Sequence, residues 1–400
     1  MLIVRWFLSK RVRHAVDACR QVRRLVRAQR DLLAPEAIRR VEQSTEGVCE
    51  LLRRGGTSAE IDAAIDGLER TVQKNLRPYP HPRARENIEV FLVTGAVVLA
   101  LRTFFIQPMA IPTGSAQPTL WGIQATVVAP GEPWPGLLRR WTIDKWWSGI
   151  SYIHIVAQRD GALTDISRPR LVFPFVRMQT LTVGGQTYRR FFPSSFETLE
   201  AQAANAGTPL TKGRFYRAGD DVLKLKVVSG DHLFVNRTIY NFRPPKRGEI
   251  IVFSSEGLSP PLMPNTHYIK RLVGLGGERV QIGNDRHLII DGQRLDASTP
   301  GFENVYSFNP RQPPRKDRYS GHVNGTVAMR HDRYHPGNFQ AFPDSSTVYV
   351  VPPRHLLAMG DNTMNSHDGR AWGAVPQDRL VGRASFVFWP ISERFGWGYR

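Results

Sequence analysis

One serine and one lysine, far apart in the chain, have surroundings that could make them a catalytic pair. The serine, Ser115, lies in "IPTGSAQPTL" (residues 111–120), where prolines stiffen the chain on both sides, so we expect its hydroxyl to be presented rather than buried. A serine hydroxyl becomes a nucleophile when a histidine or a neutral lysine takes its proton. Taken alone, however, a serine in such a turn is far more often a loop residue than a nucleophile.

Lys270 is the best candidate for that base. It lies in "HYIKRLVGLGGERV" (residues 267–280), where strand alternation turns Lys270 and Arg271 to opposite faces, so one of the two cations must face the apolar side. Loss of hydration there would lower the lysine pKa from about 10.4 to the range of about 7 to 8 that suits a general base. The histidines form no His/Asp pattern, and neither S-x-x-K nor G-x-S-x-G occurs in the sequence. The alternative is a lysine that reaches solvent and pairs with an acid.

A third segment, "MGDNTMNSHDGRAWGAVP" (residues 359–376), collects polar side chains that could orient such a pair. Within it, Asp368 and Arg370 could form a structural ion pair. The alternative is a solvated loop with helix-capping residues. Neither histidines nor cysteines near it have the spacing of metal ligands, so we expect no metal site.

The most apolar run in the chain, residues 87–107, comes shortly before the serine. Its charge-free core has the length of either a buried helix or a membrane span, but apolar flanks extend it to about 19 residues. Arg102 near its end could extend to the lipid headgroups. Arginines precede the run closely, whereas the next basic residue after Arg102 is Arg139. We therefore predict one transmembrane helix with a cytoplasmic N-terminus and an extracytoplasmic remainder.

The regions before and after this helix differ in the secondary structure that their residue patterns predict. Residues 1–86 contain a basic amphipathic segment and a capping box at Thr57 and Glu60, which predict a cytoplasmic helical hairpin of no catalytic interest. Residues 108–400 contain short β-branched and aromatic runs separated by turn residues, with a hairpin signal at Gly184-Gly185. One helix is expected near residues 196–205. The fold class is therefore mainly β, with antiparallel sheets.

The formal net charge of +19 would suit either nucleic acid or an anionic membrane surface. The basic residues are spread along the chain, and we find no compact basic tract, zinc-finger spacing or RNA-binding aromatic signature. We therefore expect no nucleic-acid partner.

In this order, after an apolar anchor, the segments resemble type I signal peptidases, the bacterial leader peptidases with a Ser/Lys dyad. "SGDHLFVNR" (229–237) and "PKRGEIIVF" (245–253) are similar to the strands between the serine and lysine motifs of that family. The resemblance covers roughly residues 85–122, 227–290 and 350–391. It implies an antiparallel β catalytic domain with an atypical insertion at about 123–228 and a second β subdomain at about 281–350.

The resemblance also implies roles for individual residues. Ser115 would attack the scissile carbonyl, and neutral Lys270 would take its proton. Thr113 would bind the oxyanion together with the Ser115 backbone N–H. Ser366 would hold Lys270 by a hydrogen bond, and the Asp368/Arg370 pair would support the loop. Strand edges and small pockets would bind the Ala-x-Ala pattern of a signal peptide, and the residues expected to bind substrate are Met109, Ile111, Ala116, Leu120 and Ile269.

The sequence departs from the family pattern in three places. Ala116 stands where methionine is usual, which should enlarge or loosen a substrate pocket. Gly369 replaces a common serine, and Thr363-Met364 replaces a usual charged pair. The insertion contains four tryptophans in "PWPGLLRRWTIDKWW" (133–147), which suit either a membrane interface or a local core.

The implied function is a serine endopeptidase that removes signal peptides from exported preproteins at the outer face of a bacterial cytoplasmic membrane. Its partners would be signal peptides, the lipid bilayer and the secretion translocon, and no metal or organic cofactor is implied. One alternative is an inactive relative that binds signal peptides or scaffolds a secretion complex. Another is a self-cleaving repressor with the same Ser/Lys chemistry, which would need a helix-turn-helix N-terminus and no membrane segment.

Overall fold

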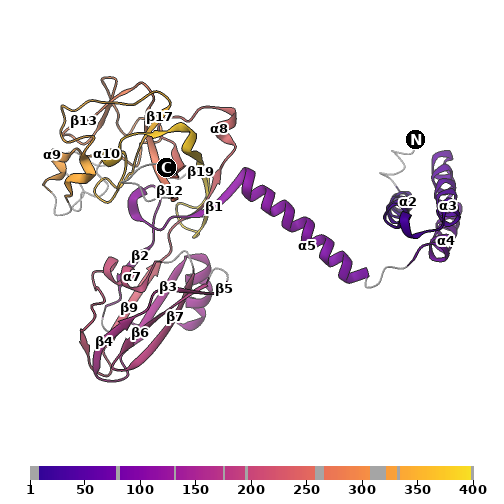
Figure 1. The fold of residues 1–400 in the computed structure, drawn as a ribbon, viewed down its shortest axis with the longest axis horizontal. Helices are drawn as coiled ribbons and strands as arrows, with labels where there is room; N and C mark the ends of the chain where they lie inside the picture. Colours follow the sequence, from indigo (N-terminus) through magenta and orange to yellow (C-terminus); the bar gives the residue numbers. More distant parts are fainter. Residues whose placement is uncertain are drawn as a thin grey trace. The chain divides into compact units, whose positions relative to one another are not determined.

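The computed structural model divides the chain into two compact units, Met1–Ala96 and Val97–Arg400 (Figure 1). The residues that it describes are 9–77, 82–129, 132–173, 176–193, 197–256, 265–306, 321–330 and 334–397.

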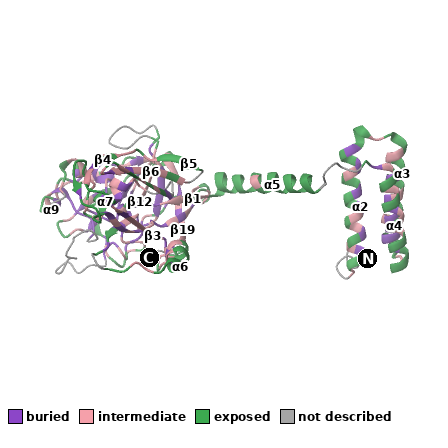
Figure 2. Cartoon of the chain, turned by 90° about the horizontal axis from the view of Figure 1, so that it is seen from below, coloured by how far each residue is buried: buried purple, intermediate pink, exposed green. Residues whose placement is uncertain are grey.

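The first unit contains a bundle of three helices, α2 (Lys10–Gln29), α3 (Pro35–Arg54) and α4 (Ser58–Asn75). Their apolar faces share one core, and the buried residues form stripes along the helices in Figure 2. The predicted capping box at Thr57 and Glu60 is confirmed. The predicted hairpin is wrong, because α3 adds a third helix. It begins with a proline in its first turn and ends at Gly55, whose φ of 90° is left-handed.

The apolar run forms helix α5 (Pro82–Ala100), which continues through a π-helical turn, η2 (Leu101–Phe105), into strand β1 (Ile106–Ala110). Residues Arg83–Phe105 form a helix of 23 residues with a mean hydropathy of 1.9, and its most apolar part is not buried against the rest of the protein. By length and composition this helix could cross a membrane.

The second unit is built on a seven-stranded sheet in which every pairing is antiparallel, so the predicted antiparallel β class is confirmed. Both faces of the sheet are covered: in β11 the side chains of Ile250 and Val252 join one core, and those of Ile251 and Phe253 join another. In spatial order the strands are β1, β10 (His232–Asn236), β19 (Leu380–Trp389), β11 (Ile250–Ser254), β12 (His267–Leu275), β17 (His355–Met359) and β18 (Val375–Pro376).

A smaller antiparallel sheet with its own core lies between β12 and β17 in the sequence. It falls in the region predicted as a second β subdomain, and the short helix α9 (Gly325–Ala328) lies between its third and fourth strands in the sequence. Its strands are β13 (Arg279–Ile282), β14 (Leu288–Ile290), β15 (Gln293–Arg294) and β16 (Tyr349–Val350).

The insertion forms a β subdomain with a separate core, drawn with β3 to β7 in Figure 1. The predicted hairpin at Gly184-Gly185 is confirmed, and both glycines have positive φ. The predicted helix is α7 (Leu199–Asn205), capped by Thr198, while residue 196 lies outside the described residues. The strands are β2 (Gln124–Val127), β3 (Ile150–Val156), β4 (Gly161–Ile166), β5 (Arg170–Phe173), β6 (Val176–Val183), β7 (Gln186–Pro193), β8 (Phe215–Tyr216) and β9 (Asp221–Val228).

Candidate active site

Ser115 lies in a short 3₁₀ turn, η3 (Gly114–Ala116), which follows β1. The turn is fixed by Asn362, whose Nδ2 donates to the Gly114 carbonyl oxygen at 2.8 Å and whose backbone N–H donates to the Ser115 carbonyl oxygen at 3.1 Å. The approach is so close that a Cβ on Gly360 would collide with the Ser115 carbonyl oxygen. The polar loop after β17 therefore holds the serine turn by its backbone.

The structure brings Lys270 and Ser115 together. The Lys270 Nζ lies 2.8 Å from the Ser115 Oγ, although the two residues are 155 positions apart in the sequence. The expectation that the prolines present the serine hydroxyl to solvent was wrong, because Ser115 is only 6% exposed and Lys270 only 4%. Strand β12 and the loop after β17 cover the serine turn, so the pair is formed inside the protein.

Burial sets the charge state of Lys270. It lowers the lysine pKa from 10.5 to about 8, while the nearby Asp368 carboxylate acts in the opposite direction and the Arg370 guanidinium adds to the lowering. The effect of Asp368 is limited because Arg370 neutralises it. Burial acts to raise the pKa of Asp368, but Arg370 outweighs this and holds it at about 2. At pH 7 about a tenth of the lysine is therefore neutral.

The lowered pKa of Lys270 predicts a stability gain when its charge is removed. Between pH 8 and 10.5 the lysine is protonated in the unfolded state but neutral in the folded state, so the folded state loses stability as the pH falls through this range. Below pH 8 the lysine is charged in both states, and the full cost of burying the ammonium is present. Lys270→Met should raise the free energy of unfolding at pH 7 by up to about 3 kcal/mol, and the gain should shrink towards pH 10. Denaturant unfolding of the full chain in detergent at both pH values measures this.

The control for that experiment is Lys212→Met. Lys212 pairs with Asp165 on the surface, with more than half of its side chain exposed, so its replacement should change stability by less than about 1 kcal/mol. A Lys270→Met protein that is less stable than the parent at pH 7, or a gain that is the same at both pH values, would contradict the buried-charge account.

Thr113 lies where an oxyanion donor would be useful. Its Oγ1 is 3.4 Å from the Ser115 Oγ, and its side chain is exposed. A Cβ on Gly122 would collide with the Thr113 carbonyl, so the glycine allows the backbone to pass this point. The hydroxyl can therefore point towards an oxygen that develops charge next to Ser115.

If Thr113 donates to the oxyanion, Thr113→Val should lower kcat by about 10²- to 10³-fold with little change in KM. Thr113→Ser keeps the hydroxyl and should remain close to wild type. Steady-state cleavage of a peptide substrate measures both. Equal activity of the valine and serine variants would remove Thr113 from the oxyanion site.

Of the two contacts expected in the loop after β17, one is present and one is not. The Asp368/Arg370 ion pair is present and fully buried, with the Arg370 Nη2 2.7 Å from the Asp368 Oδ2. Thr363, one of the atypical residues, accepts a hydrogen bond from the Arg370 Nη1 at 2.7 Å. The expected hydrogen bond from Ser366 to Lys270 is absent among the described residues, and the buried Ser366 hydroxyl instead helps to lower the pKa of Asp368. The lysine is instead directed at Ser115.

Three of the residues expected to bind substrate are core residues. Ile111, Ala116 and Leu120 are buried in one cluster with side chains of β10 and β11, and Leu120 is 0% exposed. They support the serine turn from within rather than line a surface pocket. Ala116 is 2% exposed, so its small side chain is part of the packing beneath the serine turn.

Met109 and Ile269 are half-buried and lie on strands with open edges. In the described part of the chain β1 pairs on one side only, with β10. Strand β17 pairs only with the Arg271–Leu275 part of β12, so the residues before Lys270 pair with β11 alone. Backbone groups next to Lys270 are thus available to an extended peptide.

Sequence reasoning missed a buried network on the other face of β12. Arg271 is as buried as Lys270, and its Nε and Nη2 donate to Asp361 Oδ1 and Oδ2 at 2.7 and 2.6 Å. Thr119, four residues after the serine, donates to the same carboxylate at 2.5 Å. Strand β12, the serine turn and the loop after β17 are therefore joined at one ion pair. The sequence does contain a signal for this network, because Lys270 and Arg271 are adjacent cations within an apolar strand.

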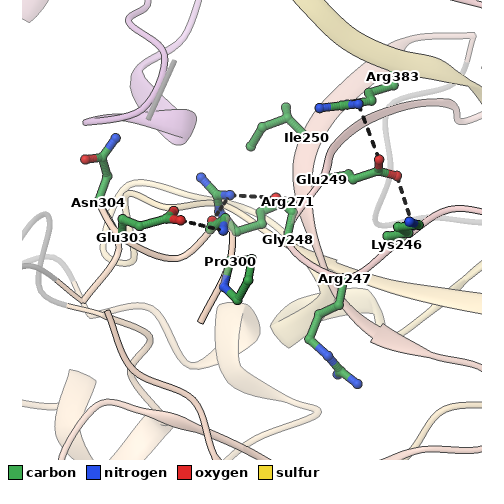
Figure 3. A pocket seen from close by; sticks show the side chains of 11 residues that line it. Lys246, Arg247, Gly248, Glu249, Ile250, Arg271, Pro300, Glu303, Asn304 and Arg383 are labelled. Carbon is green, nitrogen blue, oxygen red and sulfur yellow. Dashed lines mark hydrogen bonds and ion pairs between the residues drawn. The ribbon is translucent and has the colours of Figure 1, made fainter. Parts of the chain in front are cut away.

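Arg271 also lines a cavity of about 250 Å³, which Figure 3 shows. Its Nη1 donates to the carbonyl oxygen of Gly248 at 2.7 Å and also to that of Gly301. Glu249, which also lines the cavity, lies 3.6 Å from Arg383 and accepts from the Lys246 backbone N–H. In the residues that the structure describes, no group of three or more potential ligands could hold a metal ion.

Comparison with known proteins gives consistent matches. Residues 222–389 match the family model "Signal peptidase, peptidase S26", a range that includes Lys270 and the loop after β17 but not Ser115. The chain is 34% identical over 167 residues to signal peptidase I of Leptolyngbya laminosa, covering 41% of this chain and 62% of the relative. It is 31% identical over 186 residues to signal peptidase I of Pseudomonas fluorescens, covering 40% and 60%. The chain thus spans about three fifths of the curated relatives that it matches. A crystal structure of signal peptidase I from Enterococcus faecalis matches 36% of this chain and 98% of its own, with 26% identity and a TM-score of 0.24.

Proposed function

We propose that this protein is a membrane-anchored serine endopeptidase that acts on signal peptides. The proposal starts from residues 222–389, which match the signal peptidase S26 family model. The observation that carries the proposal is the 2.8 Å contact between the Lys270 Nζ and the Ser115 Oγ. Ser115 lies outside the matched range, so the contact supports its role independently of the family match.

In the proposed reaction, the Ser115 Oγ attacks the scissile carbonyl carbon while neutral Lys270 takes the hydroxyl proton. Thr113 and the Ser115 N–H stabilise the oxyanion. The C–N bond then breaks, and Lys270 gives its proton to the leaving amine. Water attacks the resulting ester as Lys270 takes one of its protons, and when the ester C–O bond breaks Lys270 gives that proton to the Ser115 Oγ, which restores the serine and the neutral lysine.

The proposed location is a bacterial cytoplasmic membrane, with the catalytic unit on the outer side. The helix Arg83–Phe105 supports it, because this helix is long and apolar enough to span and leads directly into β1. Arg83 and Arg85 at its beginning favour a cytoplasmic N-terminus. Recovery of the full chain in the soluble fraction without detergent would contradict this topology and favour a repressor-like relative.

The activity is tested by incubating the purified full-length protein in detergent with a preprotein that carries Ala-x-Ala before the mature sequence. We expect one cut directly after the second alanine, identified by mass spectrometry of both products. Binding of the preprotein without any cut would favour the inactive relative.

A further inference from the structure

A short helix in the insertion exposes large apolar side chains. Helix α6 (Leu137–Arg139) continues as the π-helical segment η4 (Arg140–Trp147), and together we call them the tryptophan helix. None of its apolar side chains belongs to the core of the insertion, so the local-core alternative is wrong for its tryptophans. The exposed residues are Leu137, Leu138, Trp141, Ile143, Trp146 and Trp147, and Trp146 is 71% exposed.

The tryptophan helix is firmly attached by its inner side. Asp144 is 3% exposed and accepts hydrogen bonds from the Tyr152 Oη at 3.0 Å and the Arg139 Nε at 3.4 Å. The Trp146 carbonyl oxygen accepts from the Trp389 Nε1 at 2.7 Å, and the Trp147 carbonyl oxygen accepts from the Ile391 N–H at 2.9 Å. The exposure of its apolar side is therefore built into the fold.

The charges next to these apolar side chains are positive. The only acidic residue of the helix, Asp144, is turned inward, while Lys145 lies with its Nζ 4.2 Å from the Trp141 ring centroid. A groove of about 330 Å³ beside the helix is lined by Arg140, Lys145 and Arg190 together with aromatic side chains. The Arg140 Nε is buried and has no hydrogen-bond partner among the described residues. Such a surface suits a ligand with apolar chains and an anionic head.

The tryptophan helix is connected to the serine turn through one sheet. Trp389, which holds the helix, pairs in β19 with His232 of β10, and His232 pairs with Ala110 of β1. Ala110 directly precedes the segment that carries Ser115. Helix α6 and β1, the strand that begins directly after the candidate span, lie on the same side of the catalytic unit (Figure 2).

We propose that the tryptophan helix lies in the headgroup region of a bilayer that contains anionic phospholipid. Indole rings favour that depth, and cations beside them attract anionic lipid. This second contact, in addition to the candidate span, would hold the serine turn at a fixed height above the membrane. The inference rests on the proposed membrane anchorage but not on peptidase activity.

The test uses the full-length protein in nanodiscs made from phosphatidylcholine and phosphatidylglycerol with brominated acyl chains, which quench nearby tryptophans. Incorporation into the nanodisc reports the anchor, and quenching reports the helix. Of the nine tryptophans in the chain, Trp141, Trp146 and Trp147 should account for most of the quenching. Replacing these three by phenylalanine should reduce the quenched fraction at least about twofold, because the aromatic contact remains but the reporters are gone.

The matched control is Trp372→Phe, which removes a tryptophan that packs against Tyr268 inside the catalytic unit and should not lower the quenched fraction. Leu137→Glu with Leu138→Glu keeps every tryptophan and should reduce quenching. Replacing phosphatidylglycerol by phosphatidylcholine should reduce it too. Wild-type quenching in the triple variant would overturn the proposal. Shielding of these tryptophans only in native membranes, and not in pure lipid, would also overturn it and would mean that a protein covers the helix.

Discussion

Ser115→Ala and Lys270→Met should each lower kcat/KM for signal-peptide cleavage by at least about 10³-fold. Each substitution removes one half of the contact between the Lys270 Nζ and the Ser115 Oγ, and the other half cannot act alone. Because the two residues work as a unit, the kcat/KM of the double variant should be no lower than that of the less active single variant. Cleavage of a preprotein by purified enzymes, followed to completion on gels, measures all three.

Lys212→Met is a suitable control, since it removes an exposed lysine that pairs with Asp165 in the insertion. It should retain wild-type activity. Lys270→Met is also expected to be more stable than wild type, so a loss of activity in this variant cannot be ascribed to unfolding. Retention of more than about a tenth of the activity in Ser115→Ala would reject Ser115 as the nucleophile.

The second large effect is expected at the ion pair between Arg271 and Asp361. Arg271→Met leaves the Asp361 carboxylate buried without its cation, which should cost about 3 to 5 kcal/mol of unfolding free energy. The serine turn should be displaced as well, because Thr119 donates to the same carboxylate. Thermal and denaturant unfolding in detergent measure the stability, and the cleavage rate reports the serine turn.

The double variant Arg271→Met with Asp361→Asn removes both charges and should recover part of the loss. Asp165→Asn breaks an exposed ion pair and should cost less than about 1 kcal/mol. A similar small cost for Arg271→Met would show that the buried pair does not hold the three segments together.

The pairing of Ser115 with Lys270 could be predicted from residue types and motifs, but the packing around the pair could not. The strand that carries Lys270 was predictable from alternation, as was the need for one cation to be buried. Alternation did not indicate that the opposite face is also buried, so Arg271 and its partner Asp361, 90 positions away, were missed. That pairing depends on how β12 and β17 are placed in the sheet.

Burial of the serine turn also required the tertiary structure. Proline and glycine around Ser115 indicate a stiff turn but not which surface it faces. In the fold, Ala116 and Leu120 are buried in one core with side chains of β10, β19 and β11, and Asn362 holds the turn by hydrogen bonds. Ser366 was assigned to Lys270 by resemblance alone, and in this chain its hydroxyl does not reach the lysine.

The pH dependence of kcat/KM for signal-peptide cleavage tests the central claim most directly. Burial lowers the Lys270 pKa to about 8, and only the neutral lysine can take the serine proton. We therefore predict that kcat/KM falls about tenfold per pH unit below an inflection near pH 8 and levels off above it. An inflection near pH 6.5, typical of a histidine base, or a rate independent of pH between about 6 and 9, would contradict catalysis by Ser115 and Lys270.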